Sequence, residues 1–376
     1  MNPQGRIAAF GFRSVPPKPG CAGADKFAEE LYSRLAERGY TVTGYNRVYE
    51  SADVKADTYK SINLINLQTP KRSGIEALWH SLRATIHIIV HNTGDVVHIQ
   101  NGGNSIFAIP LRLFGKKVYI GEDGAEWARG KWPWYARLYL RMTRWITAHI
   151  PNGVIFDNVF VREMFEQRYS RNYHFVPFGS DPAADQSDSD ILGTLGLEPK
   201  GYFLFVGRFI PDKGLQYLVP AFEALDTSLK LVLVGGAAEG SEFEKTLKST
   251  RDGRVLFPGY LYGRDVHTLM RNAYAYVQPS DLEGLSPVVL ENMGLGTPII
   301  CSDIRENLFV VGDTAVTFRK GDTTDLTAKL NYSLNDPPLL AANALAAQSR
   351  AENLFSWEAV TQQHEEIFFG PPAAQS

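Results

Sequence analysis

Short apolar runs alternate with helical stretches along this chain, and the alternation leaves few folds open. Residues 6–12 (RIAAFGF) predict a strand, and residues 24–39 predict a helix that ends at Gly39, because apolar side chains recur there at helical spacing. Further strands are predicted over residues 40–46, 95–100, 116–121, 152–157 and 173–178, and then over 202–208, 229–236, 254–260, 273–278, 297–303 and 315–318. Apolar strands that alternate with helices are typical of parallel sheets with helices on both faces.

This rhythm occurs twice, which predicts two domains. Each half is long enough for one doubly wound sheet, and residues 179–201, rich in Gly, Pro, Asp and Ser, are predicted to be the linker. We therefore predict an α/β chain with two Rossmann-like, doubly wound parallel-sheet domains, over residues 1–180 and 181–354. Ligands of such sheets bind at the carboxyl ends of the strands. Two of these domains, facing each other, would line a cleft with their strand-end loops.

Composition argues against several other classes of protein. A formal net charge of −3 gives no global attraction to nucleic acid. The two cysteines, Cys21 and Cys301, form no C-x-x-C motif, which favours a reducing compartment and argues against zinc. The N-terminal residues lack the pattern of a signal peptide, and no apolar run reaches about 18 residues, so we expect a cytoplasmic protein.

The loop after the first strand of the second domain carries two cations. In VGRFIPDKG (206–214), Arg208 and Lys213 follow Gly207 and precede a helix that we expect to begin near Gly214. A planar guanidinium and a point-charge ammonium at a helix N-terminus would suit a diphosphate. A solvated loop with incidental charges is the alternative.

The corresponding loop of the first domain covers residues 16–27. Its Gly20 and Gly23 would allow a phosphate or a sugar to approach the backbone closely. The loop does not match G-x-G-x-x-G, so the dinucleotide-binding fingerprint is missing. A tight loop without a ligand fits the same residues nearly as well.

Two carboxylates flank the helix start in SDLEGLSPVVLENMGLGTP (280–298). Ser286 suits the N-cap and Pro287 the first helical position, so Glu283 should lie in the loop and Glu291 on the helix. Free N–H groups at a helix N-terminus attract anions and polar oxygens. Glu283 could alternatively serve only as a partner of the helix dipole.

Together these motifs resemble a known enzyme family. Glu283 and Glu291 form E-x(7)-E, Gly207, Arg208 and Lys213 form G-R-x(4)-K, and a Gly-rich loop follows the first strand. This combination resembles the large retaining GT-B glycosyltransferase family that is often called family 4.

The resemblance covers residues 6–368. It includes residues 355–368, which are similar to the family's C-terminal helix, so residues 355–376 are expected to cross back to the first domain. Residues 115–141 are similar to bacterial rhamnosyltransferase-like enzymes of surface-polysaccharide assembly.

The resemblance implies a nucleotide-sugar site on the second domain. It implies that Glu291 binds the ribose hydroxyls, that Glu283 lies near the donor sugar, and that Arg208 and Lys213 neutralise the diphosphate. A departing nucleoside diphosphate gains negative charge, so fixed cations would lower the barrier. The backbone amides implied to hold the sugar and phosphate are those of Gly284, Leu285 and Ser286, and the backbone around Leu261, between Tyr260 and Tyr262, is implied to select the base.

On the first domain, many family members place a His where this chain has Asp123. We take Asp123 as the candidate that polarises an acceptor hydroxyl or binds a donor hydroxyl, and a turn-forming Asp before Gly124 is the alternative. The catalytic candidates are therefore Glu283, Asp123, Arg208 and Lys213, and Gly20, Gly23 and Gly207 join the donor-binding set. No cofactor and no metal site are expected, because the D-x-D at 188–190 lies in the predicted linker.

Residues 127–145 combine four tryptophans with Lys and Arg, and Glu126 is the only acid over 126–145. Such a surface could contact anionic lipid at the inner face of a membrane, which would suit a polyprenyl-diphosphate-linked acceptor. The alternative is that the apolar face is ordinary core and the arginines are solvated or bind phosphate. The expected partners are a dTDP-, UDP- or GDP-sugar and a glycan or lipid-linked acceptor, without nucleic acid.

Other activities on this architecture remain open from sequence. A nucleotide-sugar epimerase or hydrolase, or a phosphorylase, would use a similar site, and a dinucleotide-dependent oxidoreductase would use a similar fold. The missing G-x-G-x-x-G argues against the oxidoreductase. For a transferase we expect retention of anomeric configuration, because no carboxylate stands out as an inverting base. Product stereochemistry, read by NMR, would test this.

Overall fold

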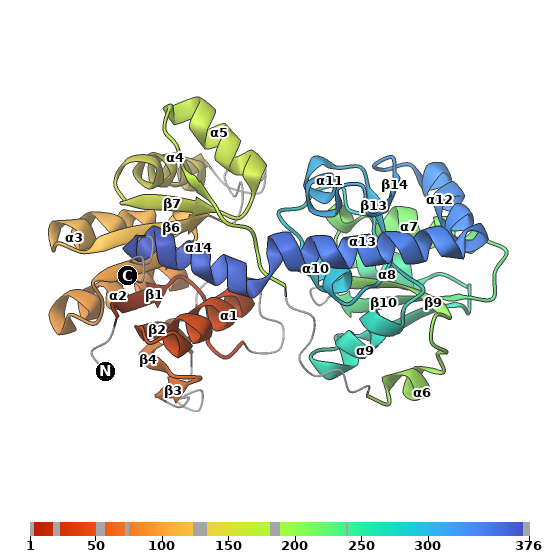
Figure 1. Cartoon of the computed structure of the whole chain (residues 1–376), viewed down its shortest axis with the longest axis horizontal. Coiled ribbons are helices and arrows are strands. Elements are labelled where there is room, and N and C mark those ends of the chain that lie inside the picture. The colour runs from red at the N-terminus through yellow and green to blue at the C-terminus, as the bar shows by residue number, and fades with distance from the viewer. Residues whose placement is uncertain are drawn as a thin grey trace, which may run out of the picture. The chain divides into compact units, whose positions relative to one another are not determined.

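The computed structural model describes residues 4–17, 23–49, 57–71, 75–122, 134–180, 189–237 and 240–370, with 134–137 described by backbone only. The chain divides into two compact units. Unit 1 is Met1–Phe178 together with Trp357–Ser376, and unit 2 is Gly179–Ser356. Each unit is an α/β body built on one sheet (Figure 1).

The sheet of unit 1 has the strand order β3-β4-β2-β1-β5-β6-β7-β8. All its pairs are parallel except β3 with β4. Chain order reverses between β1 and β5, which makes that pair the topological switch point. The strands are β1 (Arg6–Phe10), β2 (Thr41–Val48), β3 (Thr58–Tyr59), β4 (Ile62–Gln68), β5 (Val96–Gln100), β6 (Lys117–Glu122), β7 (Gly153–Phe156) and β8 (His174–Phe175).

The helices of unit 1 connect these strands, apart from the last helix of the chain, which returns to this unit. Phe27 on the first helix packs its ring against Trp357 and His364 of the last helix, so the end of the chain belongs to the core of this unit. The helices are α1 (Gly23–Glu37), α2 (Glu76–His91), the 3-10 helix η2 (Gly102–Phe107), α3 (Ala108–Leu113), α4 (Trp134–His149), α5 (Val159–Tyr169) and α14 (Trp357–Phe369).

The sheet of unit 2 is wholly parallel, with the order β11-β10-β9-β12-β13-β14. Its switch point lies between β9 and β12. The strands are β9 (Tyr202–Arg208), β10 (Lys230–Gly236), β11 (Val255–Gly259), β12 (Ala275–Gln278), β13 (Ile299–Ser302) and β14 (Val316–Phe318). Phe203, Phe205, Leu231 and Leu233 are fully buried, because a parallel strand covered on both faces has no exposed side.

Unit 2 contains one short helix inside the segment predicted as linker, which is α6 (Ile191–Leu195). Gly196, with φ +60°, ends this helix in the left-handed conformation. The other helices are η4 (Pro211–Lys213), α7 (Leu215–Glu223), α8 (Glu242–Lys248), α9 (Arg264–Asn272), α10 (Pro287–Gly294), α11 (Arg305–Val311), α12 (Thr323–Asn335) and α13 (Pro337–Phe355).

Every predicted strand is present, although some ends differ. The first strand stops at Phe10 because Gly11 has φ +111°. The last strand of unit 1 covers only His174–Phe175, and Pro177 offers no N–H to extend its ladder. The sequence did not predict β4, since Asn63 and Asn66 interrupt its apolar run.

Candidate functional site

Two loops meet at the switch point of unit 2. One follows β9 and passes through η4 into α7, and the other follows β12 and leads into α10. The amide of Asp281 donates to the carbonyl of Asp212 over 2.9 Å, which joins the two loops. Gly214 adopts φ +72°, and a Cβ on it would lie 1.9 Å from the Pro279 carbonyl oxygen. The approach of these loops therefore depends on a glycine.

We expect Gly214→Ala to lower the free energy of unfolding of unit 2 by about 1–3 kcal/mol, from left-handed strain and the clash together. Chemical denaturation would measure this change. The matched control is Gly253→Ala in the same unit, where a Cβ meets nothing within 4 Å. Equal stability of the two variants would contradict the prediction.

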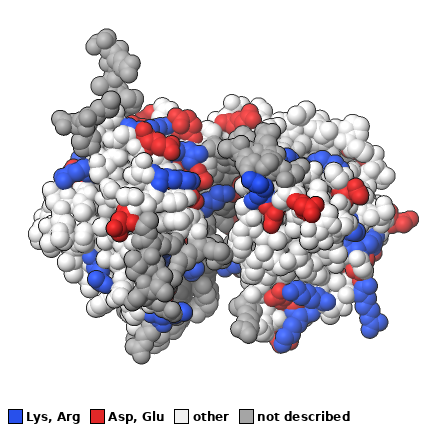
Figure 2. Space-filling model, turned by 90° about the horizontal axis from the view of Figure 1, so that it is seen from below, with Lys and Arg blue, Asp and Glu red and all other residues white. Residues whose placement is uncertain are grey.

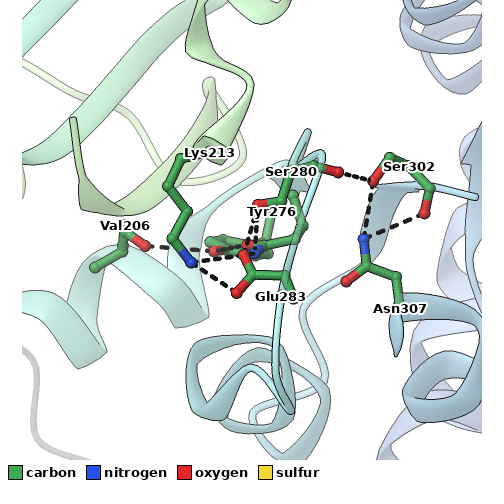
Figure 3. A network of polar contacts seen from close by, with 8 residues as sticks. Val206, Lys213, Tyr276, Ser280, Glu283, Ser302 and Asn307 are labelled. Atoms are coloured by element: carbon green, nitrogen blue, oxygen red, sulfur yellow. Dashed lines mark hydrogen bonds and ion pairs between the residues drawn. The ribbon is translucent and has the colours of Figure 1, made fainter. Parts of the chain in front are cut away.

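An ion pair between Lys213 and Glu283 lies where the two loops meet. Lys213 Nζ donates to Glu283 Oε1 and Oε2 over 2.6 and 2.7 Å. The Glu283 side chain is only 7% exposed and that of Lys213 is 19% exposed. Figure 3 shows the ammonium aimed at the carboxylate from the neighbouring loop. The sequence predicts that both residues contact the sugar donor, and the structure places them in direct contact with each other.

Neighbouring polar groups hold the Glu283 carboxylate from its other side. Gln278 Nε2 and Ser280 Oγ each donate to Glu283 Oε1 over 2.5 Å. The Tyr276 hydroxyl donates to Gln278 Oε1, which orients that amide. Burial first, and then the charges of Glu283 and Glu291, raise the pKa of Tyr276 well above its usual value. Both carboxylates of the E-x(7)-E motif therefore act on the same buried tyrosine.

A further polar layer supports Ser280. Ser302 Oγ at the end of β13 donates to the Ser280 carbonyl over 2.6 Å, and Asn307 Nδ2 donates to Ser302 Oγ over 3.0 Å (Figure 3). Sequence reasoning missed Gln278, Ser280 and this layer. The available signal was the polar pair at the carboxyl end of an otherwise apolar strand, in YVQPS.

The helix α10 begins where the sequence predicts. Ser286 stands at its N-cap with φ −80° and ψ 108°, although its hydroxyl makes no cap hydrogen bond. Leu285 and Ser286 are buried, and Gly284 is partly buried. Glu291 lies on the second turn and is partly buried.

Arg208 ends β9 and is exposed. Its guanidinium makes no hydrogen bond or ion pair to the described part of the chain, so it is available to an anion. Gly207, one residue earlier, packs under the Phe205 ring, and a Cβ there would lie 2.9 Å from that ring.

The loop after β11 presents two exposed aromatic rings. Tyr260 and Tyr262 lie nearly parallel, at 3°, with their centroids 6.3 Å apart. Leu261 between them is partly buried. A Cβ on Gly236, at the end of β10, would lie 2.9 Å from the Tyr260 ring, so this ring covers that strand end.

The switch point of unit 1 is also built on a glycine. A Cβ on Gly11 would lie 2.1 Å from the Gln100 carbonyl oxygen. Asp25 is buried and accepts hydrogen bonds from the amides of Arg13 and Ser14 over 2.6 and 3.0 Å, which fixes the loop after β1. Gly23 is the first residue of α1. Gly20 and Asp123 lie outside the described residues.

A pocket opens at the carboxyl ends of β5 and β6. Asn101 at its edge has φ 72° and ψ 118°, which is rare for a residue other than glycine. Glu122 is buried beside Gly102, where a Cβ would lie 1.8 Å from Glu122 Oε2. The lining residues are Asn101, Gly102, Gly103, Glu122, Leu140, Thr143, Arg144 and Thr147.

Residues 127–133 of the predicted aromatic and basic patch lie outside the described residues, and 134–137 are described by backbone only. On the described part of α4, Leu138, Met142 and Trp145 are exposed and Arg141 is exposed beside them. Ile146 and Ala148 are buried, so this helix has both an apolar outer face and a core face.

His98 is 1% exposed within β5. Its Nδ1 lies 2.9 Å from the Tyr32 hydroxyl. Within the described residues, no group of three or more His, Cys, Asp or Glu could hold a metal ion. Nor is any helix of the described ranges long and apolar enough to cross a bilayer.

Comparison with known proteins adds two family matches. Residues 193–350 match the family described as Glycosyl transferases group 1. Residues 10–181 match a domain of unknown function (DUF1972).

Among curated relatives, the O-antigen chain mannosyltransferase B of Escherichia coli is 29% identical over 179 residues, covering 46% of this chain and 47% of that protein. The chain spans about half the length of the first curated relatives it matches.

Among solved structures, sucrose-phosphate synthase from Thermosynechococcus elongatus is 21% identical with a TM-score of 0.80, covering 96% of this chain and 98% of that one. The structure of Anabaena Alr3699/HepE in complex with UDP-glucose is 17% identical with a TM-score of 0.77, again covering 96% and 98%. At these identities the likeness shows the fold.

Proposed function

We propose that this chain, which has the GT-B fold and carries a glycosyl transferase group 1 domain over residues 193–350, transfers a sugar from a nucleoside-diphosphate sugar to a glycan or lipid-linked acceptor. The observation that carries the proposal is the Lys213–Glu283 ion pair at the switch point of unit 2. The exposed Arg208 lies on the same loop, at the end of β9. Residues 181–354 would bind the donor, residues 1–180 the acceptor, and 355–376 would complete the first domain.

The two cations have different surroundings, which fits different tasks. Lys213 is held by Glu283, so its ammonium is already in position before a ligand arrives. Arg208 has a free planar fork, suited to two oxygens of a diphosphate. Positioned charge of this kind acts when the leaving group becomes more negative, and it needs no reorganisation at that moment.

The carboxylates would serve the sugar and the ribose. Glu283 is fixed by Gln278 and Ser280, so its free lone pairs could accept from a donor hydroxyl. Glu291 on α10 would accept from the ribose, and the amides of Gly284, Leu285 and Ser286 would face the sugar and phosphate. Gly20, Gly23 and Asp123 remain predicted donor or acceptor contacts, and backbone around Leu261 remains the predicted base contact.

The donor class and the biological role are finer parts of the proposal. The UDP-glucose complex of the Anabaena protein supports a nucleotide sugar, and we keep dTDP-, UDP- and GDP-sugars as candidates. The mannosyltransferase relative supports polysaccharide assembly, with a glycan or polyprenyl-diphosphate acceptor. Retention of configuration and peripheral membrane contact through residues 127–145 belong to the same proposal.

A thermal-shift panel with UDP, GDP, dTDP, ADP and NAD tests the proposal, each with and without magnesium. We expect one nucleoside diphosphate to stabilise the protein by about 2.7 kcal/mol at a hundredfold excess over Kd, and equally without the metal. Arg208→Ala should reduce that stabilisation. Stabilisation by NAD alone, or only with magnesium, would contradict the proposal.

A further inference from the structure

A stripe of exposed apolar side chains runs along the whole length of α2. Ile75 at its N-cap and Trp79, Leu82, Ile86 and Val90 follow one another at spacings of three or four residues, and each is between 41% and 68% exposed. A surface helix ordinarily turns its polar side chains outward. The apolar residues of this stripe instead face away from the protein.

The opposite face of α2 is already occupied. His80, Ser81, Ala84, Thr85 and Ile88 are buried, and Ala84 and Ile88 belong to the core of unit 1. The helix therefore does not need its outer stripe for folding. Nothing in the described part of the chain covers that stripe.

The apolar face continues over two neighbouring helices. Ser81 on α2 bonds Asn104 of η2 over 3.1 Å, and Tyr139 on α4 donates to Gly103 of η2 over 2.7 Å, so α2 and α4 flank η2. On α3 and just after it, Ile109, Leu113 and Phe114 are exposed, and on α4 Leu138, Met142 and Trp145 are exposed. Eleven of the nineteen exposed large apolar side chains of the described residues lie on this three-helix face. Single exposed apolar residues are normal, but this concentration marks an interaction surface.

The charges on the three-helix face have one sign. Arg83, Arg112 and Arg141 are exposed on α2, α3 and α4. Over the sequences of α2, η2, α3 and α4 the one acidic residue is Glu76, which lies 3.8 Å from the buried Arg47. On the face that Figure 2 shows, Lys and Arg are interspersed with Asp and Glu. The three-helix face therefore pairs apolar area with positive charge.

We propose that α2, α3 and α4 form a docking surface for a membrane that contains anionic phospholipid. Helices with an apolar face beside Lys or Arg lie in the headgroup region with Trp and Leu at the acyl boundary. The main alternative partner for this surface is a second copy of the chain. A two-fold interface would bring the same face against itself, with arginine meeting arginine and almost no carboxylate to separate them. Anionic lipid neutralises that charge.

This docking surface refines the membrane contact that is part of the proposed function, because it places the main lipid contact on α2 rather than on residues 127–145. It does not depend on sugar transfer. Vesicle binding can be measured without donor or acceptor, so failure of one proposal leaves the other intact.

Flotation of the full chain with vesicles of phosphatidylcholine, with and without phosphatidylglycerol, tests the proposal. We expect binding to the anionic vesicles. Ile86→Glu should lower partitioning at least about tenfold, because it removes apolar burial and adds a repelled charge. Arg141→Gln should lower it about fivefold on anionic vesicles and leave neutral vesicles unaffected.

The matched control is Leu345→Glu, the same charge change at an exposed apolar site of α13 in unit 2, which should bind as wild type. Circular dichroism melting and the nucleoside-diphosphate shift would show that Ile86→Glu is folded. Absence of flotation would overturn the proposal, as would equal loss in both Glu variants. A dimer by light scattering that Ile86→Glu dissociates would also overturn it, in favour of a second copy.

Discussion

Lys213→Ala is expected to lower turnover about 10²–10³-fold, equivalent to about 2.7–4 kcal/mol of transition-state stabilisation. The ammonium is fixed by Glu283 over 2.6 and 2.7 Å, so its position does not depend on the donor. In the proposed transfer, charge that is already in place would act fully as the nucleoside diphosphate departs. Release of the nucleoside diphosphate, measured at saturating donor, would report the loss in kcat.

Folding should survive this change. In Lys213→Ala the Glu283 carboxylate keeps its hydrogen bonds from Gln278 and Ser280, so it is not left without partners. A lost rate would then reflect a lost contact to the reacting groups. A folded variant with a lower melting temperature and much lower turnover is the expected combination, because Glu283 keeps its hydrogen bonds but loses its counter-charge.

The matched control is Lys248→Ala. Lys248 also pairs with a glutamate of unit 2, since its Nζ lies 2.7 Å from Glu244 Oε1 on α8. Lys248 is 45% exposed and Glu244 is 20% exposed, and surface pairs of this spacing contribute about 0.3–0.5 kcal/mol. Lys248→Ala should therefore leave turnover unchanged. If both variants lost activity equally, or neither did, Lys213 would have no special role.

The strands and the start of α10 could be predicted from local sequence pattern. Buried parallel strands must be apolar on both faces, so runs such as YFLFVGR are visible in one sequence. Ser286 and Pro287 likewise mark a helix start through local backbone preference. Such features depend on neighbours in sequence, which is why they could be predicted.

The sequence pattern did not predict which side chains of the site bond to one another. Lys213 and Glu283 are 70 residues apart in the sequence. The sequence predicted that each would contact the ligand, and it gave no sign that they would bond to each other. Only the switch point between β9 and β12 brings them within bonding distance. Gln278 and Ser280 carry no motif, since their role comes from a tertiary approach to one carboxylate. The strand β4 was missed because its two asparagines, Asn63 and Asn66, weaken the apolar signal, while pairing with β2 stabilises it.

Acid is expected to unfold unit 1 before unit 2. His80, His98 and His364 are at most 1% exposed, and all belong to unit 1. Burial, with the Arg47 charge second, lowers the pKa of His80 to about 3. Burial also lowers the pKa of His364 to about 4 and the pKa of His98 well below its usual value.

The direction follows from proton uptake. The unfolded chain binds a proton at each histidine below about pH 6.5, whereas the folded unit binds none until about pH 4 or lower. Stability is therefore complete above about pH 6.5 and is lost as the pH falls through that window. At pH 5, His80 and His364 should each cost about 2 kcal/mol, and His98 adds to this loss in the same direction. The loss is a large part of the stability of a typical domain.

Denaturant titrations from pH 7.5 to 4.5, with hydrogen exchange to separate the units, would measure this loss. Residues 179–356 contain a single histidine, His267, which is partly exposed, so unit 2 is the internal reference. His364→Phe keeps an aromatic ring against Phe27 and Phe368 and removes one titrating group. The pH dependence of its free energy of unfolding should correspond to about one proton fewer taken up on unfolding than in the wild type, whatever its stability at pH 7.5. If wild-type unfolding took up less than about one proton between pH 6 and 5, these rings would be accepting protons in the folded state. Burial would then not keep them neutral.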